Sequence, residues 1–600
     1  MKKVLIFSIL VLFVTSVAAQ QKITVSGVVT DETNLGLPGV TIVEEGTQNG
    51  TITNFDGEYT IEVAEQGTLV FSFIGYQPQE VEVQGRTSIN VRMTEDMVDI
   101  EEVVVVGYGT LVVKDLTSAI ATVKADELER TPSGQTMQAL QGKVAGLQVV
   151  SSGAPGDAPT IRVRGVGSYP GQNNEAPLYV VDGMFFNSID FLNPADIATV
   201  SVLKDASAAA IYGVRAANGV VLIETKSGSF NRPAEISYDG YYGIQVPQNV
   251  LKMANAEQFT TMAIESGAAA DIGNIARAMQ RYGRSRINPN VPDVNTDWYK
   301  EIMRIAPIQN HSLNVTGGSE DATYSVGASY FGQDGILDMK NDYQRFNLRA
   351  KIDFQASDWF TIGGNVIFSN SQRYIQDDAA WSQAYWATPI LPIYDEQNTS
   401  AWPINFASAQ HIGFRGGQNP MPTLEYNNNL QKGRQTLANF YGQFDIIPNK
   451  LDFKITYNHS LNSINQRDID LPYFISDAFQ NPNAAVTKRA ETFSNQILDN
   501  ILTYTDVFGD HNLTVMLGHS YRDESWQLLT ARGLDFPYEH EESWYIDQAE
   551  NIPVDNVEDD GLRQYGISYF GRLSYNFRDR YLLYGTMRAD GSSKYQEKWG

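Results

Sequence analysis

The sequence predicts a mainly β protein in which residues 229–600 form the first part of a transmembrane antiparallel β-barrel. Three observations predict this fold class. Apolar and polar residues alternate over stretches of about ten, the length of a tilted membrane-spanning strand. The links between these stretches, about eleven in number, alternate between long and short, as they do on the two sides of a barrel. The composition combines 42% hydrophobic residues with 31 Tyr and 27 Phe, which fits aromatic girdles.

The first 19 residues have the features of a cleaved secretory signal peptide. Lys2 and Lys3 precede an apolar stretch, and Val17-Ala18-Ala19 offers small residues for cleavage. The apolar stretch is shorter than the roughly 20 residues that a membrane-spanning helix needs. The sequence has no Cys, which excludes disulfides and thiol chemistry. Its formal charge of −26 is expected to repel nucleic acid, so no nucleic-acid partner is predicted.

Residues 22–94 are predicted to form a separate small β-sandwich. Short alternating runs recur there between turn residues, as at Tyr59-Thr60-Ile61-Glu62-Val63. The domain resembles the carboxypeptidase regulatory-like domain, a transthyretin-like sandwich, in Gly27-Val28-Val29, Gly39-Val40-Thr41, Asp56-Gly57-Glu58-Tyr59 and Phe73-Ile74-Gly75-Tyr76. The resemblance implies no peptidase activity. Asp56 lies in an Asp-Gly turn, for which turn geometry is a simpler explanation than a calcium site.

Residues 95–114 are predicted to be an exposed strap. Glu102, Val103, Val104, Val105 and Val106 combine an acid with four residues of high strand propensity, and Gly107-Tyr108-Gly109 follows directly. Such a segment can pair its backbone with the edge of another protein's sheet. The alternative is a buried strand, which the glycines would end early.

Residues 115–228 are predicted to be an α/β domain with helices at 136–144 and 202–212 and short strands at 161–164 and 220–224. Arg162 and Arg164 would share one strand face at a spacing of two. Two roles are open for them: ion pairs with acids of a barrel wall, or direct contact with substrate.

The same region resembles the plug domain of the SusC/RagA family of TonB-linked outer-membrane proteins. Six stretches carry the resemblance in order: 139–149, 154–156, 161–165, 177–183, 202–213 and 215–223. Two departures are Val214, where the family usually has a small polar residue, and Leu111-Val112-Val113, in place of a polar stretch. The resemblance implies that the valine run is the TonB box, and that the N-terminal sandwich is the one often found in Bacteroidota outer-membrane proteins.

In the predicted barrel, one face of each strand is apolar, as in Phe346, Leu348, Ala350, Ile352 and Phe354. If the first strand runs from the periplasm to the cell exterior, every long link lies on the outer side of the membrane and every short link lies on the periplasmic side. Plugged transporters typically have 22 strands, and lipid does not tolerate an open sheet edge. The sequence is therefore expected to be the N-terminal part of a longer chain.

No enzymatic, metal or cofactor site is predicted. The six His residues show no metal-ligand spacing, and HExxH, Walker A and GxSxG motifs are absent from the sequence. A dinucleotide fingerprint fails because Pro170 occupies the place of the third glycine. Acid pairs such as Glu541-Glu542 are expected to be solvated surface.

The resemblance implies TonB-dependent active import across the outer membrane. The implied partners are TonB with its ExbB/ExbD energising complex, a SusD-like surface lipoprotein, outer-membrane lipid, and an oligosaccharide or peptide substrate. Four loop aromatics could stack on sugar rings or pack between loops: Trp381, Tyr385, Trp386 and Trp402. The alternatives are a metallophore or vitamin receptor of the same class, and a structural or adhesive barrel. Transcriptional signalling is not expected, because no signalling domain is evident besides the sandwich.

Overall fold

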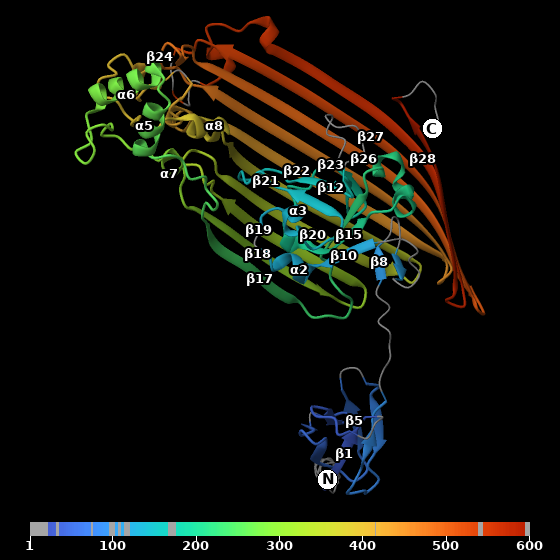
Figure 1. The fold of residues 1–600 in the computed structure, drawn as a ribbon. Coiled ribbons are helices and arrows are strands. Elements are labelled where there is room, and N and C mark those ends of the chain that lie inside the picture. Colours follow the sequence, from blue (N-terminus) through green and yellow to red (C-terminus); the bar gives the residue numbers. More distant parts are fainter. Residues whose placement is uncertain are drawn as a thin grey trace, which may run out of the picture. The chain divides into compact units, whose positions relative to one another are not determined.

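A computed structural model gives the structure of the chain (Figure 1). It describes residues 22–31, 35–47, 49–73, 76–94, 103–105, 110–112, 120–131, 133–165, 176–414, 416–537, 540 and 544–594. The predicted signal peptide lies outside these residues. The chain divides into two compact units, residues 1–102 and 103–600, which are considered separately.

The N-terminal unit is a small sandwich of two sheets, one mixed and one antiparallel, around an apolar core. One sheet has the strand order β4-β1-β7, in which β7 joins in parallel, and the other has the order β3-β2-β5-β6. Alternation along β4 buries Tyr59, Ile61 and Val63 and exposes the residues between them. The strands are β1 (Lys22–Thr30), β2 (Thr41–Glu44), β3 (Gly50–Ile52), β4 (Glu58–Ala64), β5 (Thr68–Ser72), β6 (Gln79–Glu82) and β7 (Val91–Arg92).

The second unit contains an α/β domain built on a five-stranded sheet of order β10-β15-β16-β13-β14, with a separate hairpin of β11 and β12. The buried β13 pairs with β16 in parallel. The strands are β10 (Ile120–Lys124), β11 (Leu147–Val150), β12 (Thr160–Val163), β13 (Leu178–Val181), β14 (Met184–Phe186), β15 (Ile197–Leu203) and β16 (Val220–Thr225). The helices are α2 (Ala125–Glu129), α3 (Thr136–Ala139), η2 (Pro194–Asp196), α4 (Ala206–Ala209) and η3 (Ala210–Ala216).

The two helices predicted in this domain are shorter than the sequence indicates. The helix expected over 136–144 is α3, which ends at Ala139 and continues as turns. In the helix expected over 202–212, Val202 and Leu203 instead belong to β15, and helical structure begins at Ala206. Tertiary pairing outweighs local propensity here, because β15 lies between β10 and β16.

Eleven long strands form one antiparallel sheet in which every strand pairs with the next long strand in sequence, which confirms the predicted strand number. The sheet is open in the described residues, with β17 and β29 at its edges. The strands are β17 (Glu235–Gln245), β18 (Ala306–Gly318), β19 (Ala322–Gln333), β20 (Tyr343–Ser357), β21 (Phe360–Ile375), β22 (Asn429–Ile447), β23 (Leu451–Asp470), β26 (Ala485–Phe508), β27 (His511–Leu534), β28 (Val557–Phe577) and β29 (Tyr581–Ser592).

Long and short connections lie at opposite ends of this sheet, called the loop end and the turn end below. Helices α5, α6, α7 and α8 gather at the loop end (Figure 1). The loop elements are α5 (Ala256–Glu265), α6 (Ala269–Tyr282), α7 (Trp298–Ile302), α8 (Ala379–Trp386), η4 (Ala409–Ile412), α9 (Met421–Glu425), β24 (Tyr473–Ser476), β25 (Phe479–Asn481), η6 (Ile546–Gln548) and η7 (Val554–Asn556). None of the helices in the described residues has the length and apolar character of a membrane span.

The two faces of the sheet differ in chemistry. On β20, the even-numbered Phe346, Leu348, Ile352 and Phe354 are 42–53% exposed on one face. The odd-numbered residues face the α/β domain, which lies against the inner face of the sheet (Figure 1). Alternation along a strand therefore gives one apolar outer surface and one polar inner surface from the same residues.

Candidate functional site

The predicted TonB box lies in a short strand. Its residues Val103–Val105 form β8, which pairs antiparallel with β9 (Thr110–Val112), joining Val104 to Leu111 in register. Glu102 and Val106 lie outside the described residues. The partner strand includes Leu111 and Val112, at which the sequence departs from the polar stretch common in the family. The valine segment therefore already has one backbone partner within the chain.

The two arginines predicted on one strand face are separated by the end of that strand. Strand β12 stops at Val163, and Arg164 has a left-handed φ of 58°. The Arg164 guanidinium forms an ion pair with Asp205, which belongs to the α/β domain itself rather than to the wall of the large sheet. Arg162 remains on β12 and is half-buried. The ion pair found for Arg164 is thus within the domain, and the two expected roles of these arginines stay predictions.

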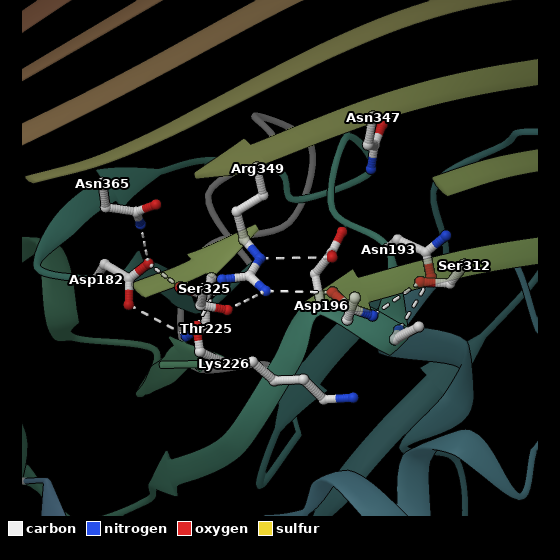
Figure 2. A network of polar contacts seen from close by, with 12 residues as sticks. Asp182, Asn193, Asp196, Thr225, Lys226, Ser312, Ser325, Asn347, Arg349 and Asn365 are labelled. Carbon is white, nitrogen blue, oxygen red and sulfur yellow. Dashed lines mark hydrogen bonds and ion pairs between the residues drawn. The ribbon is translucent and has the colours of Figure 1, made fainter. Parts of the chain in front are cut away.

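A buried arginine of the large sheet holds the α/β domain to the inner face (Figure 2). The side chain of Arg349 on β20 is fully buried, and its Nε lies 3.5 Å from Asp196 Oδ1 of η2. Its Nη1 donates to the carbonyl oxygen of Lys226 at 2.5 Å, and its Nη2 donates to Ser325 Oγ at 2.9 Å and Asn314 Oδ1 at 3.3 Å. One guanidinium thus joins the α/β domain to three neighbouring strands of the sheet.

The charge of this buried pair is fixed by the arginine. Burial raises the pKa of Asp196, and the neighbouring Arg349 acts in the opposite direction. Because a guanidinium does not lose its proton in a protein, the carboxylate form of Asp196 is the partner that it requires.

The turn between β13 and β14 makes a second polar attachment, also seen in Figure 2. Asp182 Oδ2 accepts hydrogen bonds from Asn365 Nδ2 of β21 at 2.6 Å and from Thr225 Oγ1 at 2.8 Å. Lys351 Nζ of β20 lies 4.0 Å from Asp182 Oδ1. The carboxylate therefore links two strands of the α/β sheet to two strands of the wall.

A third attachment involves Arg345, the inward neighbour of Asn347 and Arg349 on β20. It is 1% exposed and donates to the carbonyl oxygens of Gly134, at 2.9 Å, and Asp190. Asn347 donates to the carbonyl oxygen of Phe191 at 2.9 Å. Burial raises the pKa of Asp190, while the Ser188 hydroxyl bonded to it and the nearby Arg345 act to lower it.

The opposite side of the α/β domain is attached mainly by apolar contacts. Ile211 and Tyr212 of η3 belong to one buried cluster with wall residues Ile497, Met516 and Phe570. At the rim of this contact, Arg215 forms an ion pair of 2.7 Å with Glu524 of β27. The domain is thus held mainly by polar contacts on β20–β22, where Ile367 and Leu437 add one apolar contact, and mainly by apolar packing on β26–β28.

The four loop aromatics differ in exposure. Trp381 packs against the apolar core of the loop helices, with its ring 6.4 Å from that of Tyr299, an arrangement that fits packing between loops. Tyr385 and Trp386 are 46% and 68% exposed and form an edge-to-face pair. Trp402 is 45% exposed. Three of the four therefore present aromatic surface at the loop end.

The residues that attach the α/β domain to the wall are absent from the set predicted from sequence. Arg345, Asn347, Arg349 and Lys351 occupy alternate positions between the apolar residues of β20. A charged residue inside a membrane-spanning strand must face the barrel interior, so the alternation itself carried this signal. In the described residues, no group of three or more His, Asp and Glu side chains is arranged to hold a metal ion.

Comparisons with known proteins agree with this architecture. Residues 112–220 match the model of the TonB-dependent receptor plug domain, and residues 25–105 match the CarboxypepD_reg-like domain. The chain is 32% identical to TonB-dependent receptor P3 of Formosa agariphila, over 99% of this chain and 57% of the relative. It is 30% identical to TonB-dependent receptor SusC of Bacteroides thetaiotaomicron, over 100% of this chain and 60% of the relative.

A solved structure shows the same fold. A chain of the RagAB peptide importer in its open-open state superposes with a TM-score of 0.69 at 23% identity, covering 83% of this chain and 57% of that chain. The chain thus spans somewhat more than half the length of these relatives. A plug domain seated on the inner wall of long antiparallel strands defines a TonB-dependent receptor. The chain carries the plug domain of that class and is similar over its length to members of it, SusC among them.

Proposed function

We propose that this chain is the plug-bearing part of an outer-membrane importer that TonB drives. The observation that carries the proposal is the α/β domain held against the inner wall by buried polar contacts, with a valine strand near its N-terminal edge. Polar contacts within a wall can be exchanged for water one at a time as a plug moves, whereas the outer face remains apolar for lipid. The chain acts as a transporter rather than as an enzyme.

TonB would engage the segment Glu102 to Val106 by adding a strand to it. Strand β8 pairs with β9 on one edge, so TonB either takes the other edge or replaces β9. Force from the ExbB/ExbD complex would then reach the plug through residues 106–120.

The proposed cargo is an oligosaccharide or a peptide, delivered with a SusD-like surface lipoprotein. Similarity to SusC and the fold shared with the RagAB peptide importer support this cargo class. The exposed rings of Tyr385, Trp386 and Trp402 are candidates for first contact, because aromatic faces stack on sugar rings and peptide side chains. Growth on defined glycans or peptides, with and without the intact gene, separates the two cargoes.

The experiment that tests TonB coupling is Val104→Pro, in cells growing on the cargo identified in that way. Proline removes the backbone donor of Val104 and cannot extend a ladder. We expect uptake to fall to the level of a strain without the gene, with an unchanged amount of folded receptor in the outer membrane. The matched control is Val104→Thr, which keeps the donor and strand propensity and should retain uptake. Normal uptake by Val104→Pro would refute the coupling.

A further inference from the structure

Two cavities lie one after the other between the plug and the same three wall strands. The first, about 330 Å³, is lined by the plug residues 156–158, 188 and 190–191 and by β21, β22 and β23. The second, about 290 Å³, is lined on the plug side by Asp182, Gly183 and Glu224, and again by β21–β23 among its wall strands. Both cavities thus border the plug segment 182–191.

The strand register places the cavities at different heights. Arg373 and Gln431, paired near the loop end, line the first cavity, whereas Asn365 and Asn439, paired nearer the turn end, line the second. Between them, Ser369 and Gln435 form the lowest inward pair of the first cavity. Only one inward-facing pair separates the two cavities on this wall.

That pair is Ile367 and Leu437, which are register partners on β21 and β22. They are 1% and 0% exposed, and they belong to the buried apolar cluster of the plug that includes Met184. The other inward-facing residues of β21 from 363 to 373, and of β22 from 431 to 441, are polar residues, glycines and one tyrosine. Ile367 and Leu437 therefore form an apolar pair, called the collar below, between the two cavities on a wall whose other inward-facing residues are mainly polar.

We propose that cargo crosses the plug along β21–β23 through these two cavities, and that Ile367 and Leu437, closed against the plug segment 182–191, are the gate between them. This inference rests on the proposed import function. A narrow apolar constriction excludes water and ions at rest, and it opens when one of its sides moves away. The plug segment 182–191 is the side that can move, because its polar attachments to β20–β22 are individual hydrogen bonds and one ion contact. Its other contact with this wall is the apolar packing of Met184 and Ile189 in the cluster of Ile367 and Leu437.

The charges of the cavities indicate the class of solute. The first cavity is lined by two bases, Arg373 and Arg434, and two acids, Asp157 and Asp190. The second contains Lys351 and Lys454 together with four acids: Asp182, Glu224, Asp353 and Asp499. Burial raises the pKa of Glu224, and the nearby Lys351 acts in the opposite direction. Mixed charge with an excess of acid suits an uncharged or zwitterionic hydrophilic oligomer and disfavours a polyanion.

The passage is tested without TonB or cargo by measuring the conductance of the purified receptor in a planar bilayer in KCl. Ile367→Ser/Leu437→Ser should raise the conductance roughly tenfold, because the collar becomes polar. The matched control is Val366→Ser/Ala438→Ser, the adjacent register pair on the lipid-facing side of the same strands. The single variant Leu437→Ala should give a smaller increase if the double variant folds poorly. If the receptor with the inner pair of substitutions and the receptor with the outer pair had equal conductance, the proposed passage would be refuted.

A second measurement follows gate opening in cells. Residues 1–600 contain no Cys, so Ile367→Cys and Ile497→Cys each add one thiol to this part of the receptor, at an inward-facing wall residue that is 1% exposed. A membrane-impermeant sulfonated maleimide should label Ile367→Cys several times faster than Ile497→Cys, which lies in the apolar contact on β26. Equal labelling of the two thiols would overturn the inference. A failure of the proposed TonB coupling would look different: Ile367→Cys would label equally fast with and without Val104→Pro.

Discussion

Arg349 shows how one residue can determine whether a plug stays in place. Its side chain is fully buried, and it has partners on the plug and on two neighbouring strands. A buried ion pair is weak evidence for net stability, but removing one partner is costly because the other charge stays buried. The residue therefore acts as an attachment whose loss the plug cannot compensate locally.

Replacing this arginine tests that role. Arg349→Ala should weaken plug docking by about 3–5 kcal/mol, because it leaves the Asp196 carboxylate buried without a partner. Limited proteolysis of the plug in purified receptor, together with thermal unfolding, measures the loss. Arg373→Ala is the control: its ion pair with Asp157 is partly exposed, so a loss of at most about 1 kcal/mol is expected. Similar protection in Arg349→Ala and the unmodified receptor would contradict this account.

Glu44 gives the N-terminal sandwich a predictable pH dependence. Its carboxylate accepts hydrogen bonds from Asn49 Nδ2 at 3.0 Å and from the backbone of Ala64 at 2.8 Å, and the bond from Asn49 is the main cause that lowers its pKa. A lowered pKa contributes stability above the ordinary value of 4.5 and loses it as pH falls through the folded-state pKa. Glu44→Gln should therefore cost roughly 1 kcal/mol at neutral pH.

Denaturant unfolding of residues 22–102 at a series of pH values measures this effect. The difference between Glu44→Gln and the unmodified sandwich should shrink below pH 4.5 and vanish in stronger acid. A difference that stays constant from neutral pH into acid would show that packing, rather than ionisation, is responsible.

At the scale of elements, the plug approaches the wall closely at positions that only glycine fits. A Cβ added to Gly134 would lie 2.0 Å from Phe331 Cζ of β19, and Phe331 is 1% exposed, so its ring has little room to move. The carbonyl oxygen of the same glycine accepts the hydrogen bond from Arg345. At Gly134, the segment before α3 is therefore held against the wall both by close packing on Phe331 and by the hydrogen bond from Arg345.

Gly134→Ala should unseat this segment. We expect a cost of about 1–3 kcal/mol, which is typical of overpacking a filled contact. Hydrogen exchange over residues 133–150 should become faster, because the hydrogen bond to Arg345 lengthens as the segment shifts. Gly585→Ala on β29, where an added Cβ meets no atom within 4 Å, is the control and should change little. Unchanged exchange in Gly134→Ala would refute the seating.

Elements also show what sequence could predict. The outer stripe of β20 follows from alternation, because lipid selects apolar residues at every second position. The gate does not follow from alternation, because Ile367 and Leu437 are single apolar residues on polar faces. Only the register of two strands separated by a long loop brings them together. The plug helices were overestimated because alanine-rich sequence favours helix, while β15 is fixed by pairing on both sides.

At the scale of the whole molecule, the arrangement separates three tasks. The wall provides an apolar outside and a mainly polar inside, and the loop helices pack into a separate apolar core at one end. The plug is attached to the wall, and its segment 182–191 closes against the proposed gate residues Ile367 and Leu437 of the wall. The order of plug and wall could be predicted from sequence, because plug-domain motifs precede the long alternating strands, whereas the loop helices were expected only as long links. The contacts between plug and wall could not be predicted, because they join residues as far apart as Arg349 and Asp196 through a fold that only long-range pairing defines.

The alternation along β20 has a consequence for how this chain can evolve. Neighbouring residues of this strand are under different selective pressures. Residues on the outer face must remain apolar because they contact lipid, whereas residues on the inner face must keep their contacts with a plug that moves. Saturation mutagenesis of residues 345–354 should therefore give a pattern of period two, in which odd positions reject nearly every replacement and even positions accept any other apolar side chain.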